Sequence, residues 1–93
     1  MHTYIVTYDL MKPGQGYGDL IKALESYGYY WHIMQSTWII CTGKTAEQIR
    51  DHLLNFLDSN DKLFVGRLSG EAAWYGFGEK GNAWLKDALT VKA

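Results

Sequence analysis

The chain has 93 residues, of which 47% are hydrophobic and 20% charged, and its formal net charge is −1. This length suits a single domain, and the composition excludes an intrinsically disordered chain. Nine basic residues against ten acidic ones do not give the strongly basic balance that is typical of duplex-binding proteins. No apolar run is long enough to span a membrane, and the first residues lack a signal-peptide pattern. We therefore expect a cytoplasmic protein with no membrane partner.

Aromatic residues make up 15% of the chain, which is high for this length. Trp and Tyr favour interfaces in which one end of the side chain stays polar. The composition therefore indicates a subunit or ligand interface.

The only cysteine is Cys41. It excludes an intrachain disulfide and a cysteine-based metal cluster within one chain. We expect Cys41 to be a small buried residue of a strand, as free cysteines usually are.

The first half of the chain predicts a strand, a helix and a hairpin. Residues 2–9 are rich in β-branched and aromatic side chains and predict the first strand. Apolar residues at helical spacing over 17–27 predict a helix that ends at Gly28 in a left-handed cap. Two further β-prone runs, 29–34 and 37–42, predict a hairpin whose turn is Gln35-Ser36.

The second half begins with a helix signal. Thr45-Ala46-Glu47-Gln48 matches a capping box. The helix that follows is expected to bury Ile49, Leu53, Phe56 and Leu57, while His52 faces solvent. After a polar turn at 58–61, residues 62–68 predict the fourth strand.

The tail has two predicted elements. Ala72–Phe77 is interpreted as a short extra strand. Asn82–Leu89 is interpreted as a short amphipathic helix that starts at an Asn82 cap.

This order of elements, β-α-β-β-α-β, predicts an α+β protein with a ferredoxin-like sandwich. We expect one domain over residues 1–93, with a C-terminal extension over 78–93. Both faces of the predicted sheet are apolar, although two helices in this layout cover only one of them. The C-terminal tail, another subunit or a ligand must cover the second face, and we favour a twofold homodimer.

Asp9 is the first candidate functional residue. It ends the first strand before a glycine-containing loop, where a carboxylate is well placed to bind a hard cation such as Mg²⁺ or Mn²⁺. Two copies of Asp9 at a dimer axis would form a shared metal site that activates water for phosphodiester hydrolysis. The alternative is that Asp9 caps the loop or helix beyond it. No second acidic residue follows Asp9 closely, the next being Asp19.

The hairpin carries the second group of candidates. His32 is interpreted as a general base, and Gln35, Ser36 and Thr37 as ligand contacts. The alternative for His32 is a structural histidine that is held by hydrogen bonds.

Two further features point to a nucleic-acid ligand. Trp38, among other aromatic residues, is a candidate stacking platform for bases, with core or interface packing as the alternative. Lys12 opens a glycine-rich loop before a helix and is a candidate contact to an anion. The loop lacks the ending of a Walker motif.

Several motifs carry a resemblance to known families. Tyr4-Ile5-Val6-Thr7-Tyr8-Asp9-Leu10 resembles the start of the CRISPR-associated adaptation protein known as Cas two. A longer pattern over residues 3–77 is similar to small bacterial and phage proteins described as SinR-like. It consists of Tyr8-Asp9-Leu10, Lys12-Pro13-Gly14, Trp31-His32, Ser36-Thr37-Trp38, Thr45-Ala46-Glu47-Gln48 and Asn60-Asp61.

The resemblance implies a ferredoxin-like homodimer in which Asp9 is a metal ligand near the dimer axis. Some relatives, including virulence-associated protein D, are described as ribonucleases, and others act as structural scaffolds. The expected function is therefore nucleic-acid binding by a homodimer, with RNA or DNA as partner, and metal-dependent endonuclease activity is left open. The alternative is a non-catalytic dimeric module that binds a nucleotide, a small ligand or a partner protein.

Overall fold

The computed structural model describes residues 1–11, 17–69 and 71–89. Within them the chain forms an α+β structure with one four-stranded antiparallel sheet and three helices. In chain order the elements are β1 (His2–Asp9), α1 (Gly18–Glu25), β2 (Tyr29–Met34), β3 (Thr37–Thr42), α2 (Ala46–Leu54), β4 (Lys62–Leu68) and α3 (Gly78–Leu89). Among the described helices, none combines the length and the apolar composition that a membrane crossing requires.

The four strands begin and end where the sequence predicts them. Their order across the sheet is β2-β3-β1-β4, with every neighbouring pair antiparallel. The connection through α1 therefore passes over β3, and the connection through α2 passes over β1. The two central strands, β1 and β3, carry the densest β-branched and aromatic runs, as expected for strands that are buried over most of their length.

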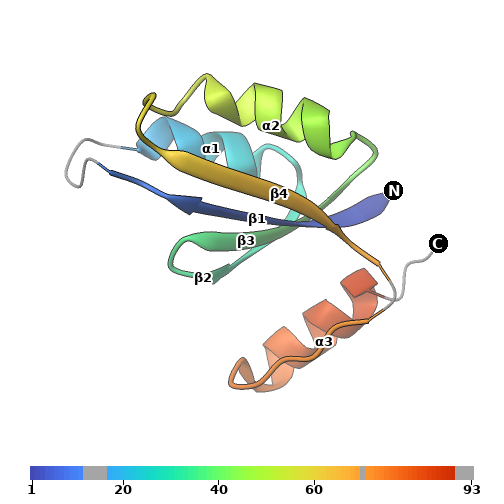
Figure 1. The fold of residues 1–93 in the computed structure, drawn as a ribbon. Coiled ribbons are helices and arrows are strands. Elements are labelled where there is room, and N and C mark those ends of the chain that lie inside the picture. The colour runs from blue at the N-terminus through green and yellow to red at the C-terminus, as the bar shows by residue number, and fades with distance from the viewer. Residues whose placement is uncertain (12–16, 70, 90–93) are drawn as a thin grey trace.

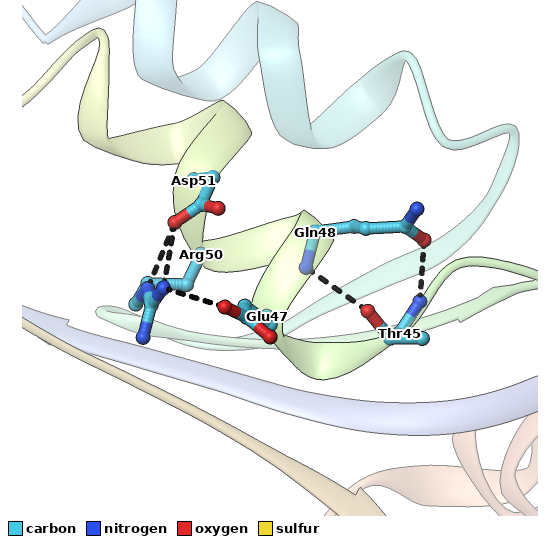
Figure 2. A network of polar contacts seen from close by, with 5 residues as sticks. All are labelled: Thr45, Glu47, Gln48, Arg50 and Asp51. Carbon is cyan, nitrogen blue, oxygen red and sulfur yellow. Dashed lines mark hydrogen bonds and ion pairs between the residues drawn. The ribbon is translucent and has the colours of Figure 1, made fainter.

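The expected glycine after α1 and the expected capping box before α2 are both present, although α1 ends earlier than predicted. Helix α1 stops at Glu25, and Gly28 has the left-handed φ of 88° that was predicted for the cap. Figure 2 shows the capping box of α2: Gln48 N–H donates to the Thr45 hydroxyl at 3.1 Å, and Thr45 N–H donates to the Gln48 side chain at 2.9 Å. The Arg50 contacts in the same view, with Asp51 at 2.8 Å and Glu47 at 3.6 Å, are exposed and add little stability.

Helices α1 and α2 cover one face of the sheet, which we call the helix-pair face (Figure 1). From β1 it receives Tyr4, Val6 and Tyr8, the alternation that the sequence predicts. The main core lies here and is made of Tyr4, Val6, Tyr8, Leu20, Ala23, Leu24, Trp38, Ile40, Ile49 and Leu53.

Helix α3 lies on the opposite face, which we call the α3 face (Figure 1). The Thr3 hydroxyl donates to the carbonyl of Ala88 at 2.8 Å and lies 3.4 Å from the Cys41 sulfur. Large rings fill the space between helix and sheet, with the Trp31 centroid 5.2 Å from Phe77 and 5.8 Å from Trp84. Of the three covers proposed from sequence, the C-terminal tail is therefore the one that protects this end of the α3 face.

Gly81 allows α3 to approach the sheet. A Cβ atom at Gly81 would lie 2.5 Å from the Trp31 ring and 2.6 Å from the Phe77 Cβ. Real Cβ atoms do not approach so closely, so only glycine fits between these two residues without a shift of the helix.

Two predictions for the tail are wrong. Ala72–Phe77 is not a strand. Helix α3 begins at Gly78 rather than Asn82, and the Asn82 side chain accepts a hydrogen bond from the Trp74 indole at 2.9 Å instead of capping a helix. Packing of Gly81 and Leu85 against the sheet overrides the weak helix propensity of this glycine-rich segment.

The first testable prediction uses Cys41, which is 3% exposed and whose thiol pKa is raised mainly by burial. In Gly81→Ala, the added methyl group forces α3 away from Trp31 and uncovers the thiol. We expect Cys41 to react with a thiol reagent about tenfold faster than in wild type, the factor that corresponds to about 1.4 kcal/mol of lost docking free energy. The control is Gly43→Ala, because a Cβ there meets nothing within 4 Å. Equal rates in the two variants would contradict this account of α3.

The second prediction concerns pH. The hydrogen bond that Tyr29 donates to Asp87 of α3 raises the pKa of Tyr29 to about 12. An unfolded tyrosine loses its proton near pH 10. The stabilisation from the neutral phenol is therefore complete below pH 10 and is lost as the pH rises towards 12. We expect the urea midpoint of wild type to fall more steeply over this range than that of Tyr29→Phe. Tyr75→Phe, at a 96% exposed tyrosine, should keep the wild-type slope.

Candidate functional site

The candidate site lies where β1 ends, on the α3 face. Asp9 is the exposed last residue of β1, and its partner in the ladder is Lys62, the first residue of β4. One step inward, Thr7 pairs with Thr37 of β3 on one side and with Phe64 of β4 on the other. The hydroxyl groups of Thr7 and Thr37 lie 3.0 Å apart.

Two large apolar side chains are exposed around these polar groups. Phe64 is 61% exposed and Met34, the partner of Thr37 on β2, is 52% exposed. The Phe64 ring lies against Gly66, since a Cβ there would be 2.8 Å from the ring edge. We call this region, which α3 leaves uncovered, the open end. It consists of Thr7, Asp9, Met34, Thr37, Lys62 and Phe64.

The polar contacts beside Asp9 bear on its alternative role as a loop cap. Two residues beyond the strand, the backbone N–H of Met11 donates to the Asp61 carboxylate at 2.8 Å. The capping alternative for Asp9 concerns the backbone of residues 12–18, and residues 12–16 lie outside the described residues. Lys12, the predicted anion contact, lies outside the described residues.

The hairpin candidates are held by one another and by β1. One ring nitrogen of His32, Nε2, lies 3.0 Å from the Gln35 carbonyl. The Ser36 carbonyl accepts from the Thr7 hydroxyl at 3.2 Å and from the Tyr8 N–H at 3.1 Å. These contacts fix the turn between β2 and β3 against β1.

His32 and Asp9 are not brought together. The His32 ring stacks on Trp38, with centroids 4.1 Å apart and planes 12° apart, so it lies towards the helix-pair face. Asp9 shares the α3 face with Thr7. The hairpin arrangement matches the structural alternative for His32 and does not aim its ring at the carboxylate.

Trp38 is 1% exposed, and its indole N–H donates to the Tyr8 hydroxyl at 3.0 Å. A ring buried in this way has no face to offer to a base. The packing alternative therefore applies to Trp38, and the stacking prediction is wrong for this residue.

Sequence reasoning missed two polar residues. The Asp61 carboxylate accepts hydrogen bonds from Met11, Tyr17 and Asp58, which span up to 50 residues of chain. The only sequence signal was its place in the Asn60-Asp61 motif.

The second missed residue is His52, which was expected to face solvent. Instead it is half-buried, and its Nδ1 atom lies 2.8 Å from the Tyr27 hydroxyl. Burial also raises the pKa of Tyr27. This pair joins the turn after α1 to α2, and Tyr27 packs against the main core.

An open apolar groove adjoins the open end. It has a volume of about 330 Å³ and lies between the sheet, the segment 72–77 and α3. Ile5, Ile33 and Ile39 form its sheet side, and Met34 belongs to both the groove and the open end. The groove offers no charged side chain to a ligand.

The metal site predicted at Asp9 is not completed by the described residues of one chain. The described residues contain no group of three or more His, Cys, Asp or Glu side chains placed to hold a metal ion. A site based on Asp9 therefore needs ligands from outside the described part of a single chain.

Comparison with known proteins gives information on the fold alone. No protein-family model matches the chain. Its structure is similar to a crystal structure of a hypothetical protein, TT1823, from Thermus thermophilus, with a TM-score of 0.64 and 24% sequence identity. The match covers 81% of this chain and 90% of that one.

Proposed function

We propose that the protein is a ferredoxin-like homodimer that binds nucleic acid and holds one Mg²⁺ or Mn²⁺ ion between its two Asp9 residues. The fold part of this proposal is supported by the strand order β2-β3-β1-β4, in which each of the first two helices connects strands that have another strand between them. This feature supports a split βαβ arrangement. In this proposal α3 is an addition that follows the βαββαβ unit.

The observation that carries the proposal is the open end of the α3 face. Phe64 and Met34 expose apolar surface on a sheet that is otherwise covered on both sides. A second copy related by a twofold axis would place the same patch against itself and remove both side chains from water. Asp9 lies at the edge of this patch, so its partner copy would approach it.

The chemistry of Asp9 fits a hard cation only in such a dimer. Carboxylate oxygens are the preferred protein ligands of Mg²⁺ and Mn²⁺, and Asp9 is exposed. A single chain offers one such carboxylate at the open end, whereas two chains offer a pair. A bound ion would lower the pKa of a coordinated water and favour phosphodiester hydrolysis.

A non-catalytic dimeric binding module is the second candidate. It is favoured by the separation of His32 from Asp9, because a general base must lie within hydrogen-bond reach of the reacting proton. In this form the dimer binds a nucleotide, a small ligand or a partner protein, and the ion has a structural role.

The third prediction tests the interface. We expect the wild-type protein to sediment as a dimer at micromolar concentration. Phe64→Glu should weaken the dimer about 30-fold or more, the effect of losing a central interface residue worth about 2 kcal/mol. Leu54→Glu is the matched control, since Leu54 is a similarly exposed apolar residue on α2. A wild-type protein that sediments as a single chain would refute the dimer.

The fourth prediction tests the metal site by titration calorimetry with Mn²⁺. We expect one ion per two wild-type chains and a loss of at least about tenfold in affinity for Asp9→Asn. Asp51→Asn, at an exposed carboxylate on α2, should bind like wild type. Unchanged affinity in Asp9→Asn would rule out the proposed site.

Nuclease assays on the wild-type protein and on Asp9→Asn decide between the two candidate functions. Mn²⁺-stimulated cleavage of RNA or DNA that disappears in Asp9→Asn would identify a nuclease. Binding of a single-stranded oligonucleotide without cleavage would identify a binding module. Cleavage that survives in Asp9→Asn would point to a contaminant or to another site.

A further inference from the structure

A single carboxylate joins three separate segments beside the open end. Asp61 precedes β4 directly, and its Oδ1 atom accepts from the Met11 backbone N–H at 2.8 Å. The Tyr17 hydroxyl lies 3.2 Å from both carboxylate oxygens. The Asp58 N–H donates to Oδ2 at 2.8 Å.

Two of these donors lie on either side of the connection from β1 to α1. Met11 is two residues beyond the end of β1, and Tyr17 directly precedes α1. Asp61 therefore fixes both flanks of residues 12–16 to the turn between α2 and β4. We call this set of contacts, made by Met11, Tyr17, Asp58 and Asp61, the Asp61 clamp.

The clamp does more than shape its own turn. An aspartate in a turn commonly bonds to backbone close to it in sequence, as Asp61 does with Asp58. The bonds to Met11 and Tyr17 cross 50 and 44 residues and are not needed for that turn. Hydrogen bonds to an ionised acceptor are about twice as strong as neutral ones, so these contacts are a substantial anchor.

The position of the clamp connects it to Asp9. Lys62, which follows Asp61 directly, is the ladder partner of Asp9, and this pair is the last of the β1–β4 ladder. A strand end that has no anchor beyond its last pair frays readily. The Met11 contact supplies such an anchor two residues after Asp9.

We propose that Asp61 is a positioning residue for Asp9: its carboxylate clamps the chain on both sides of the β1–α1 connection and holds the Asp9 end of the strand in place. This inference rests on the proposed function, because it assigns to Asp61 the support of the carboxylate that binds the ion. Asp61 itself is occupied by the clamp and does not bind the ion.

The test is Asp61→Asn, which keeps the shape of the side chain but removes its charge and one of its acceptor oxygens. Nuclear magnetic resonance gives a readout that is independent of activity. We expect the Met11 amide to exchange with deuterium at least about tenfold faster, and the cross-strand Overhauser effect between Asp9 and Lys62 to weaken. We also expect the affinity for Mn²⁺ to fall about tenfold, as it does when a residue that orients a ligand is lost.

Two controls separate the clamp from a general loss of stability. Tyr17→Phe removes a single donor and should raise Met11 exchange less than Asp61→Asn does. Asp51→Asn, at an exposed carboxylate on α2, should leave Met11 exchange and the Asp9–Lys62 contact unchanged. An equal response to Asp51→Asn and Asp61→Asn would overturn the inference.

The wild-type protein provides a test that does not depend on a folded Asp61 variant. The Met11 and Asp58 amides donate to the two oxygens of one carboxylate. Their proton resonances should therefore shift with a common midpoint when acid protonates Asp61. Separate midpoints, or a Met11 amide that does not titrate, would overturn the clamp.

The failure of this inference is distinguishable from failure of the proposed function. If Asp61→Asn leaves the Asp9–Lys62 contact and Mn²⁺ affinity at wild-type values while Asp9→Asn abolishes binding, the positioning role is wrong and the metal site stands. If Asp9→Asn binds Mn²⁺ like wild type, the proposed metal site is wrong. The positioning role proposed for Asp61 is then also wrong, even if the exchange of the Met11 amide detects the clamp itself.

Discussion

A sheet with two apolar faces is the constraint on which the rest of this structure depends. Strand β1 sends Tyr4, Val6 and Tyr8 to one face, and Thr3 and Ile5 to the other. Helices α1 and α2 shelter the first face with a closely packed core. The second face needs a separate cover, which α3 provides over part of its length (Figure 1). The exposure of β1 follows that boundary, since Thr3 is buried, Ile5 and Thr7 are half-buried and Asp9 is exposed.

Large aromatic rings cover this part of the α3 face, at the place where a glycine of α3 approaches the sheet. Trp31, Phe77 and Trp84 fill the space between α3 and the sheet, and Gly81 lets the helix approach the Trp31 ring. Aromatic side chains bury large areas per residue, so one short helix is enough to shelter this end. The high aromatic content therefore reflects an internal interface as well as any external one.

The sequence was sufficient for the strands and the first turns because their signals are local. β-branched and aromatic runs define the strands, and the Thr45–Gln48 capping box forms as predicted. The α3 start was missed because its determinants are tertiary: Gly78 and Gly81 are poor helix formers, and packing on Trp31 outweighs that cost.

The site was harder to predict than the fold for the same reason. Asp9 could be placed at the exposed strand end from periodicity alone. The role of Asp61 depends on Met11 and Tyr17, which are 50 and 44 residues away, and no local pattern predicts such bonds. His52 was misjudged likewise, because its partner Tyr27 comes from the turn after α1, 25 residues away.

The two aspartates at this strand end are suited to opposite tasks. Asp61 accepts from three segments, so an ion could bind it only by replacing bonds that hold the chain together. Asp9 is exposed at the edge of an uncovered patch. Because α3 covers the other end of this face, a second copy that docked on the described part of this face would contact the open end. A small interface gives a dimer that depends on protein concentration. In the proposed site, an ion shared by two Asp9 residues would bind the assembled form, and by linkage it would tighten the dimer. Assembly and metal binding would then be coupled equilibria, so each of them has to be measured at a controlled level of the other.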